Sequence, residues 1–114
     1  MNLDELAEAI RKVSSEEVVQ KLFRSMVEWK VNDETAEVLK ERIERYIGNT
    51  WIESHEDHKK VYELWTSFRD EAISGIGGMT MNERLHQFGL FERFDACTDQ
   101  EAQLAIYSKF QAKS

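Results

Sequence analysis

SSEEVVQKLFRSMVEW, residues 14–29, carries the two signals that decide the fold. Ser14 stands three residues ahead of Glu17, a spacing in which a hydroxyl caps the first turn of a helix and the acid bonds back to the cap residue. Apolar residues then recur at the spacing of a helix with one buried face. Because they cover nearly half of the helix circumference, we expect this helix to be central and to contact more than one neighbour; they are Val18, Val19, Leu22, Phe23, Met26, Val27 and Trp29.

The same capping pattern recurs along the chain, each time ahead of an apolar stretch. No proline occurs among the 114 residues, so nothing of that kind interrupts the helices. We therefore predict an all-α fold, a compact orthogonal or bundle-like domain of five to seven helices. The further capping pairs are Thr50 with Glu53, Ser54 with Asp57, Thr80 with Glu83, and Thr98 with Glu101.

The apolar spacing also predicts where the helices lie. The chain is expected to be a single domain over 1–114, with main helices in 1–74, a glycine-rich turn in 75–79 and short helices in 80–114. In the turn, Gly75-Ile76-Gly77-Gly78 is interpreted as a hinge or a tight turn. The tail after residue 110 is expected to fray. The first predicted helix runs over 3–13, and the second follows the caps Ser14 and Ser15 and carries the apolar residues from Val18 to Trp29. The others run from the caps Asn32 and Asp33 to a left-handed end at Gly48-Asn49, from Trp51 or His55 to Ser74, over 81–88, over 90–94 and onward from Thr98.

The charge balance limits the class of partner. The net charge is −7 and the pI is near 5.0, which argues against nucleic acid as a ligand, because phosphate binding requires clustered Lys and Arg. The sequence has no apolar run of the roughly 20 residues that cross a bilayer, and its acidic start lacks the features of a signal peptide. With a single cysteine, Cys97, we expect a cytoplasmic protein that contacts no membrane and whose partner is another protein.

Four glutamates form an acidic stripe on the third predicted helix. They are spaced by three, four and three residues and fall within an arc of about 80°, roughly opposite the Leu39–Ile43 face. Like charges four residues apart disfavour a helix by a few tenths of a kcal/mol. The stripe is interpreted either as a docking face for a basic partner or as a plain solvated face; it consists of Glu34, Glu37, Glu41 and Glu44.

A second candidate region follows that helix. Trp51 lies in a predicted loop next to the acids Glu53, Glu56 and Asp57. An aromatic residue beside acids is typical of an interface hot spot, and the alternative is that Trp51 covers the end of the core as a staple. The other two tryptophans, Trp29 and Trp65, lie on apolar helix faces and are predicted to be in the core.

His55 and His58 lie three residues apart, so both imidazoles can reach one metal ion on a helix surface. The spacing is not H-E-x-x-H, and no third ligand is evident in the sequence. We therefore predict no metal site and interpret His58 as a residue at the core boundary, with metal binding by the two histidines as the alternative.

The sequence also lacks the common catalytic signatures. No G-x-S-x-G, P-loop or dinucleotide fingerprint occurs, and Cys97 lies between Asp95 and Asp99, which disfavour a thiolate. We accordingly predict that the protein is not an enzyme and requires no cofactor.

The segment Gly78-Met79-Thr80-Met81-Asn82-Glu83-Arg84-Leu85, continued by Gly89-Leu90 and Phe94-Asp95, resembles the C-terminal part of small uncharacterised bacterial helical proteins with the pattern M-T-x-N-E-R-L, then G-L, then F-D. The resemblance covers under a third of the chain and implies a bacterial origin and a compact helical ending, but no activity. Within the segment, Thr80 and Glu83 are expected to cap, Leu85 and Phe88 to pack and Gly89 to turn the chain. Asn82, Arg84 and Arg93 are left as surface contacts.

These observations favour a non-enzymatic, acidic helical module that binds another protein. Its most concrete form is an immunity- or antitoxin-type inhibitor that covers a basic surface with the acidic stripe and the Trp51 region. Two alternatives stay open: a metal-binding or regulatory domain that uses His55 and His58, and a homo-oligomeric structural module such as a homodimer.

Overall fold

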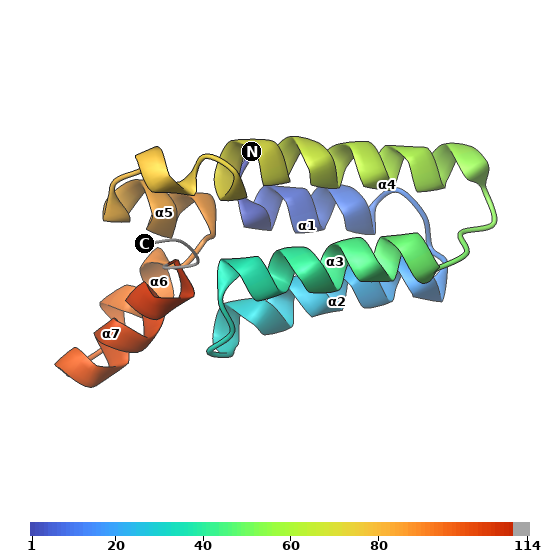
Figure 1. The fold of residues 1–114 in the computed structure, drawn as a ribbon. Helices are drawn as coiled ribbons and strands as arrows, with labels where there is room; N and C mark the ends of the chain where they lie inside the picture. Colours follow the sequence, from blue (N-terminus) through green and yellow to red (C-terminus); the bar gives the residue numbers. More distant parts are fainter. Residues whose placement is uncertain (111–114) are drawn as a thin grey trace.

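The capping residues and apolar periodicity produce an all-α fold (Figure 1). The computed structural model describes residues 1–110, and the predicted tail 111–114 lies outside them. Seven α-helices occur in the described part, with no strand among them, so the predicted class and helix count are confirmed. The helices are α1 (Leu3–Arg11), α2 (Glu17–Val31), α3 (Ala36–Asn49), α4 (His55–Phe68), α5 (Met81–Gln87), α6 (Phe91–Asp95) and α7 (Gln100–Lys109), with a π-helical turn η1 (Arg69–Ile73) and a 3₁₀ turn η2 (Ile76–Gly78).

Helices α1 to α4 lie side by side as a bundle, and α5 to α7 extend from one end of it (Figure 1). α1 packs against α2 and α4, while α2 also packs against α3, as its wide apolar face predicted. That face is narrower than expected, because Val27 is 44% exposed. Within residues 1–110, none of the helices combines the length and apolar character needed to cross a membrane.

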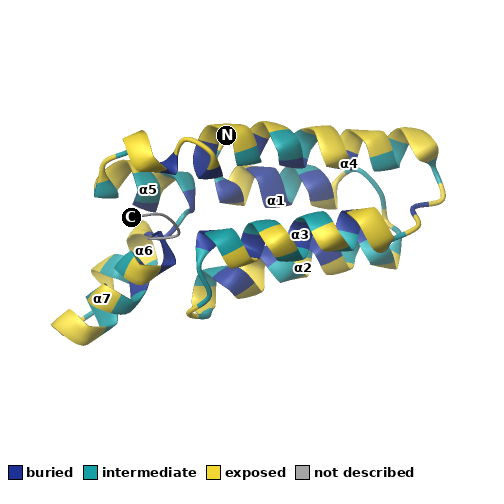
Figure 2. Ribbon diagram, viewed as in Figure 1, coloured by how far each residue is buried: buried dark blue, intermediate teal, exposed yellow. Residues whose placement is uncertain are grey.

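Buried residues occur along all four helices of the bundle and continue into its short-helix end (Figure 2). Trp29 and Trp65 are both fully buried, as predicted. Tyr62 follows the buried Val61 in the sequence but is 48% exposed, so it does not belong to the core face of α4. The core face of α4 consists of Val61, Trp65 and Phe68, at spacings of four and three.

The helix caps agree with the sequence patterns at two of five places. Thr80 and Glu83 form the complete reciprocal box at the start of α5, and the Ser54 hydroxyl accepts from the Asp57 N–H at the start of α4. The other three pairs do not start a helix as boxes. Thr50 follows the last residue of α3, α2 begins after Glu16, and α7 is capped by the Asp99 carboxylate.

Two caps differ from those that the sequence suggested. α3 is capped by the Thr35 hydroxyl rather than by Asn32 or Asp33. Asn32 instead belongs to the α2–α3 loop, where its side-chain oxygen accepts from the Glu34 N–H at 3.0 Å. A complete box that the patterns missed, Asn2 with Glu5, starts α1, because an amide side chain can cap a helix as a hydroxyl does.

The glycines follow the prediction only in part. Gly48 lies inside α3 rather than at a left-handed helix end, whereas Gly75-Ile76-Gly77-Gly78 forms a tight 3₁₀ turn, which was one of its two interpretations. Among the described residues, a left-handed backbone occurs only at Gly89, with φ of 65°. A Cβ there would clash with the Asp4 carboxylate, so glycine at this position lets the α5–α6 turn approach α1 closely.

The α4 segment was predicted to continue to Ser74 and does so in two forms. Its α-helical part ends at Phe68, and the next turn is π-helical, with the Ser74 N–H donating to the Arg69 carbonyl at 2.9 Å. The wider turn places two consecutive residues, Ala72 and Ile73, in the core.

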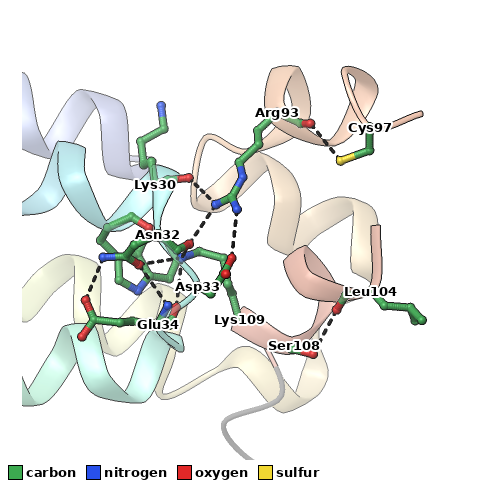
Figure 3. Close-up of polar contacts among 10 residues, drawn as sticks. Lys30, Asn32, Asp33, Glu34, Arg93, Cys97, Leu104, Ser108 and Lys109 are labelled. Carbon is green, nitrogen blue, oxygen red and sulfur yellow. Dashed lines mark hydrogen bonds and ion pairs between the residues drawn. The ribbon is translucent and has the colours of Figure 1, made fainter. Parts of the chain in front are cut away.

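Two cationic side chains attach the short helices to the C-terminal end of α2 (Figure 3). Arg93 donates to the carbonyls of Lys30 at 2.7 Å and Asn32 at 2.9 Å, and Lys109 donates to the Trp29 carbonyl at 2.6 Å. The last carbonyls of a helix have no partner inside it and carry partial negative charge, which favours cations there. Arg93 is thus a structural residue, and its prediction as a surface contact is wrong.

Candidate functional site

The acidic candidate residues lie along the whole length of α3 and at both of its ends. α3 begins at the end of the bundle that carries the short helices and ends at the opposite end (Figure 1). Glu34 precedes α3 in the chain, and Trp51 follows it. The 14 residues of α3 separate these ends by about 20 Å at 1.5 Å per residue. The eight predicted residues therefore do not form one compact patch.

Two members of the acidic stripe are engaged inside the molecule. Glu34 forms an ion pair with Arg42 and accepts from the Asn32 amide at 2.7 Å. Glu44 accepts from the indole N–H of buried Trp65 at 3.3 Å and from Arg69 at 3.4 Å. The stripe was expected to face away from the core, and for Glu44 this is wrong, because that side of α3 turns towards α4 and η1.

The other two members, Glu37 and Glu41, have no ion-pair partner among residues 1–110. Glu41 is exposed and Glu37 is half-buried. Within the stripe, only the carboxylates of these two glutamates are thus free to form an ion pair with a partner.

Alanine substitution distinguishes Glu44, which bonds inside the molecule, from Glu41, which has no ion-pair partner among the described residues. We expect Glu44→Ala to lower the free energy of unfolding by about 1–2 kcal/mol, because the buried indole N–H of Trp65 loses its acceptor. Glu41→Ala, on the same helix, is expected to stay within about 0.5 kcal/mol of the wild type. Urea denaturation monitored by circular dichroism measures both, and equal losses would contradict the distinction.

The α3–α4 loop holds the most exposed aromatic residue of the described chain. Trp51 is 82% exposed, so the interpretation of Trp51 as a staple over the core is wrong. The adjacent Ile52, at 7% exposure, covers the core end instead. Trp51 borders an open hollow of about 320 Å³, whose lining includes Gly48, Glu53 and both His55 and His58.

The three carboxylates near Trp51 lie at the same end of the bundle as its indole. Glu53 and Glu56 are exposed and Asp57 is half-buried, and none of the three has an ion-pair partner in the described part of the chain. The loop itself is held in place, because the Glu53 N–H donates to the Glu16 carboxylate at 3.1 Å and Ser54 caps α4. An exposed indole is thus presented on a fixed backbone among unpaired negative charges.

The two histidines occupy different environments. His58 lies with Nε2 3.3 Å from the Ile47 carbonyl oxygen, at the boundary of the core, while His55 is exposed. Across residues 1–110, no three side chains of His, Cys, Asp or Glu gather as a potential metal-ligand set. Within these residues, no third protein ligand accompanies His55 and His58.

Sequence reasoning missed Lys109, which is fully buried and bonds to the end of α2. The only sequence signal is its position on the helical arc of Ala102 and Ile106, which a lysine ordinarily occupies as a boundary residue. The oxygen atoms that accept its hydrogen bonds belong to residues 75 to 80 positions earlier in the chain, so no local sequence pattern reveals them.

Residues 78–95 fold as the expected helical ending. Leu85 and Phe88 are buried and Gly89 turns the chain into α6. Arg84 is not a simple surface residue, since it donates to the Phe110 carbonyl at 3.4 Å. The relation to small bacterial helical proteins stays a prediction, because no protein-family model, curated protein or solved structure matches this chain.

Proposed function

We propose that this protein binds another protein through the Trp51 surface, which consists of Trp51, Glu53, Glu56 and Asp57. The observation that carries the proposal is the 82% exposure of Trp51 on a loop whose backbone is fixed. An indole left in water gives up the favourable free energy that its burial would supply, and tryptophan is the residue type most enriched at interface hot spots. A fixed loop also avoids the entropy cost of ordering when a partner docks.

The charges favour a basic partner. The protein has a net charge of −7, and the carboxylates of the Trp51 surface are not neutralised by ion pairs within residues 1–110. A lysine or arginine of the partner can lie over the indole face and pair with these carboxylates at the same time. Glu37 and Glu41 extend the negative potential along α3.

The concrete form that we propose is a non-enzymatic inhibitor of the immunity or antitoxin type, which acts by covering a basic surface of its target. This role involves no chemical step and no cofactor. Its support is physical: a small helical scaffold, an acidic surface and one exposed aromatic anchor.

The test is a pull-down from bacterial lysate with the wild type and Trp51→Ala, at low and high salt. We expect a basic protein to be retained by the wild type, to be weakened at high salt because salt screens the charges, and to be lost with Trp51→Ala. Val31→Ala is the matched control, because Val31 is 74% exposed at the opposite end of the bundle. Retention by Trp51→Ala equal to that of the control would reject the Trp51 surface.

Two further measurements sharpen this test. Glu53→Lys/Glu56→Lys is expected to abolish binding, whereas Glu28→Lys/Glu92→Lys, which changes the net charge equally at exposed positions elsewhere, is expected to preserve it. Trp29 and Trp65 are fully buried, so acrylamide quenching of fluorescence reports mainly on Trp51. Quenching should fall when the captured protein is added in purified form.

A further inference from the structure

The side chain of Lys109 ends in a cage of oxygen atoms (Figure 3). Its Nζ lies 2.6 Å from the Trp29 carbonyl, 2.7 Å from the Asn32 carbonyl, 2.9 Å from the Glu34 carbonyl and 3.2 Å from the Asn32 side-chain oxygen. The same nitrogen is 3.9 Å from the centroid of the Trp29 ring, and the residue is fully buried. No carboxylate bonds directly to it among the described residues, so neutral oxygens and an aromatic face surround this nitrogen.

The cage is built by residues 29–34 and is supported by contacts that do not involve Lys109. The Trp29 indole N–H donates to the Thr35 carbonyl at 2.9 Å, which fixes the ring against the loop. The Asn32 oxygen accepts from the Glu34 N–H, and its amide donates to the Glu34 carboxylate. The cage oxygens are therefore held in place by contacts within α2 and the α2–α3 loop that do not involve Lys109.

We infer that the C-terminal end of α2 is a binding site for a primary amine, which Lys109 occupies as a tethered ligand. A protonated primary amine has three N–H donors on a compact head, which match several oxygens converging from one side. A quaternary ammonium has no N–H donor, and a planar guanidinium spreads its donors over a fork, so neither reproduces these bonds. The ligand class is thus a lysine-type side chain.

The tether explains how α7 is held. Within α7 only Ile106 and Lys109 are buried, and Leu104 is 52% exposed. Attachment therefore depends on the last turn of the helix and on Phe110, which follows it. A helix held by so few buried residues is expected to open locally more readily than the bundle.

The experiment is chemical rescue of Lys109→Ala at neutral pH. The substitution empties the cage, and ethylammonium chloride is added while the melting temperature is measured. We expect a saturable rise of about 5 °C at an ethylammonium concentration ten times its dissociation constant. Tetramethylammonium chloride at equal concentration should give no such rise, and neither should ethylammonium with the wild type, whose cage is filled.

The matched control variant is Lys40→Ala, which removes a half-buried lysine that has no ion pair among residues 1–110. An equal response to ethylammonium in both variants, an equal response to the two cations, or no response would each overturn the inference.

A measurement on the wild type covers the case in which Lys109→Ala does not fold. Lysine labelled with ¹⁵N makes the ammonium protons visible by NMR when they exchange slowly with water. We expect one ammonium signal that is protected from exchange and shifted upfield by the Trp29 ring current, and Lys109→Met should lack it if that variant folds. If all lysine ammonium groups exchange alike and none is shifted, the cage does not hold the amine.

Discussion

Phe88→Ala is expected to lower the free energy of unfolding by about 3–5 kcal/mol, which is the range for truncation of a buried phenylalanine. Phe88 is fully buried and lies at the centre of an aromatic cluster. Its ring centroid is 5.3 Å from that of Trp29, 5.6 Å from that of Phe68 and 5.4 Å from that of Phe110. Trp29 belongs to α2, Phe68 to α4, and Phe110 directly follows α7, so the cavity would loosen the junction between the bundle and the short helices.

Urea denaturation measures this effect, and Phe91→Ala is the control. Phe91 is a phenylalanine of the same region that is 39% exposed, so its truncation is expected to cost about 1 kcal/mol or less. Losses of equal size would mean that Phe88 does not join the two parts. The slope of the unfolding free energy against urea concentration gives a second readout. If the junction opens separately from the bundle, unfolding departs from two-state behaviour and this slope changes.

The positions of the helices were predictable from the sequence, because the spacing of apolar residues on one helix face is a local sequence pattern. Leu3, Leu6 and Ile10 are buried at the spacing that predicts a helix, and the same holds for Leu39, Ile43 and Ile47. The caps were less predictable, because a Ser or Thr side chain has several backbone partners within reach. Thr50 lies between Ile47 and Ile52, which are both buried, and so it belongs to the turn between two helices rather than to a helix start.

The candidate site was predictable in composition and not in arrangement. A helical wheel placed Glu44 with Glu37 and Glu41, but the position of α4 decides which of them meets another side chain, and the wheel does not contain that information. The exposure of Trp51 likewise depends on Ile52 taking the position over the core end. The burial of Lys109 was the least predictable from the sequence, because its hydrogen-bond acceptors belong to the distant α2–α3 region of the chain.

The burial of Lys109 has a consequence for stability at alkaline pH. Burial lowers the pKa of Lys109 from the ordinary 10.5 to about 8, and the positive charge of Arg93 adds to this effect. Asp33 and Glu34 act in the opposite direction, since their negative charges favour the ammonium form. The cause of the shift is thus the cost of holding a charge away from water, which the cage oxygens offset only in part.

The sign of the pH dependence follows from comparing the two states. Below pH 8 the folded and unfolded chains both carry the proton, so the cost of burying the ammonium is constant. Between about pH 8 and 10.5 the unfolded chain still holds a proton that the folded chain has lost, so stability rises with pH across this window. The full gain is about 3 kcal/mol, from 1.36 kcal/mol per pKa unit.

The measurement is the difference in unfolding free energy between the wild type and Lys109→Met, determined in urea from pH 7 to pH 10. We expect this difference to shift in favour of the wild type as pH increases, with most of the change above pH 8. Burial raises the pKa of Tyr46, whose titration lowers stability near the top of this range, but Tyr46 is present in both proteins and cancels in the difference. A difference that stays constant would mean that the cage oxygens and the Trp29 ring solvate the ammonium as well as water does. A shift in favour of the variant would mean that they solvate it better, and the pKa of Lys109 would then lie above its ordinary value.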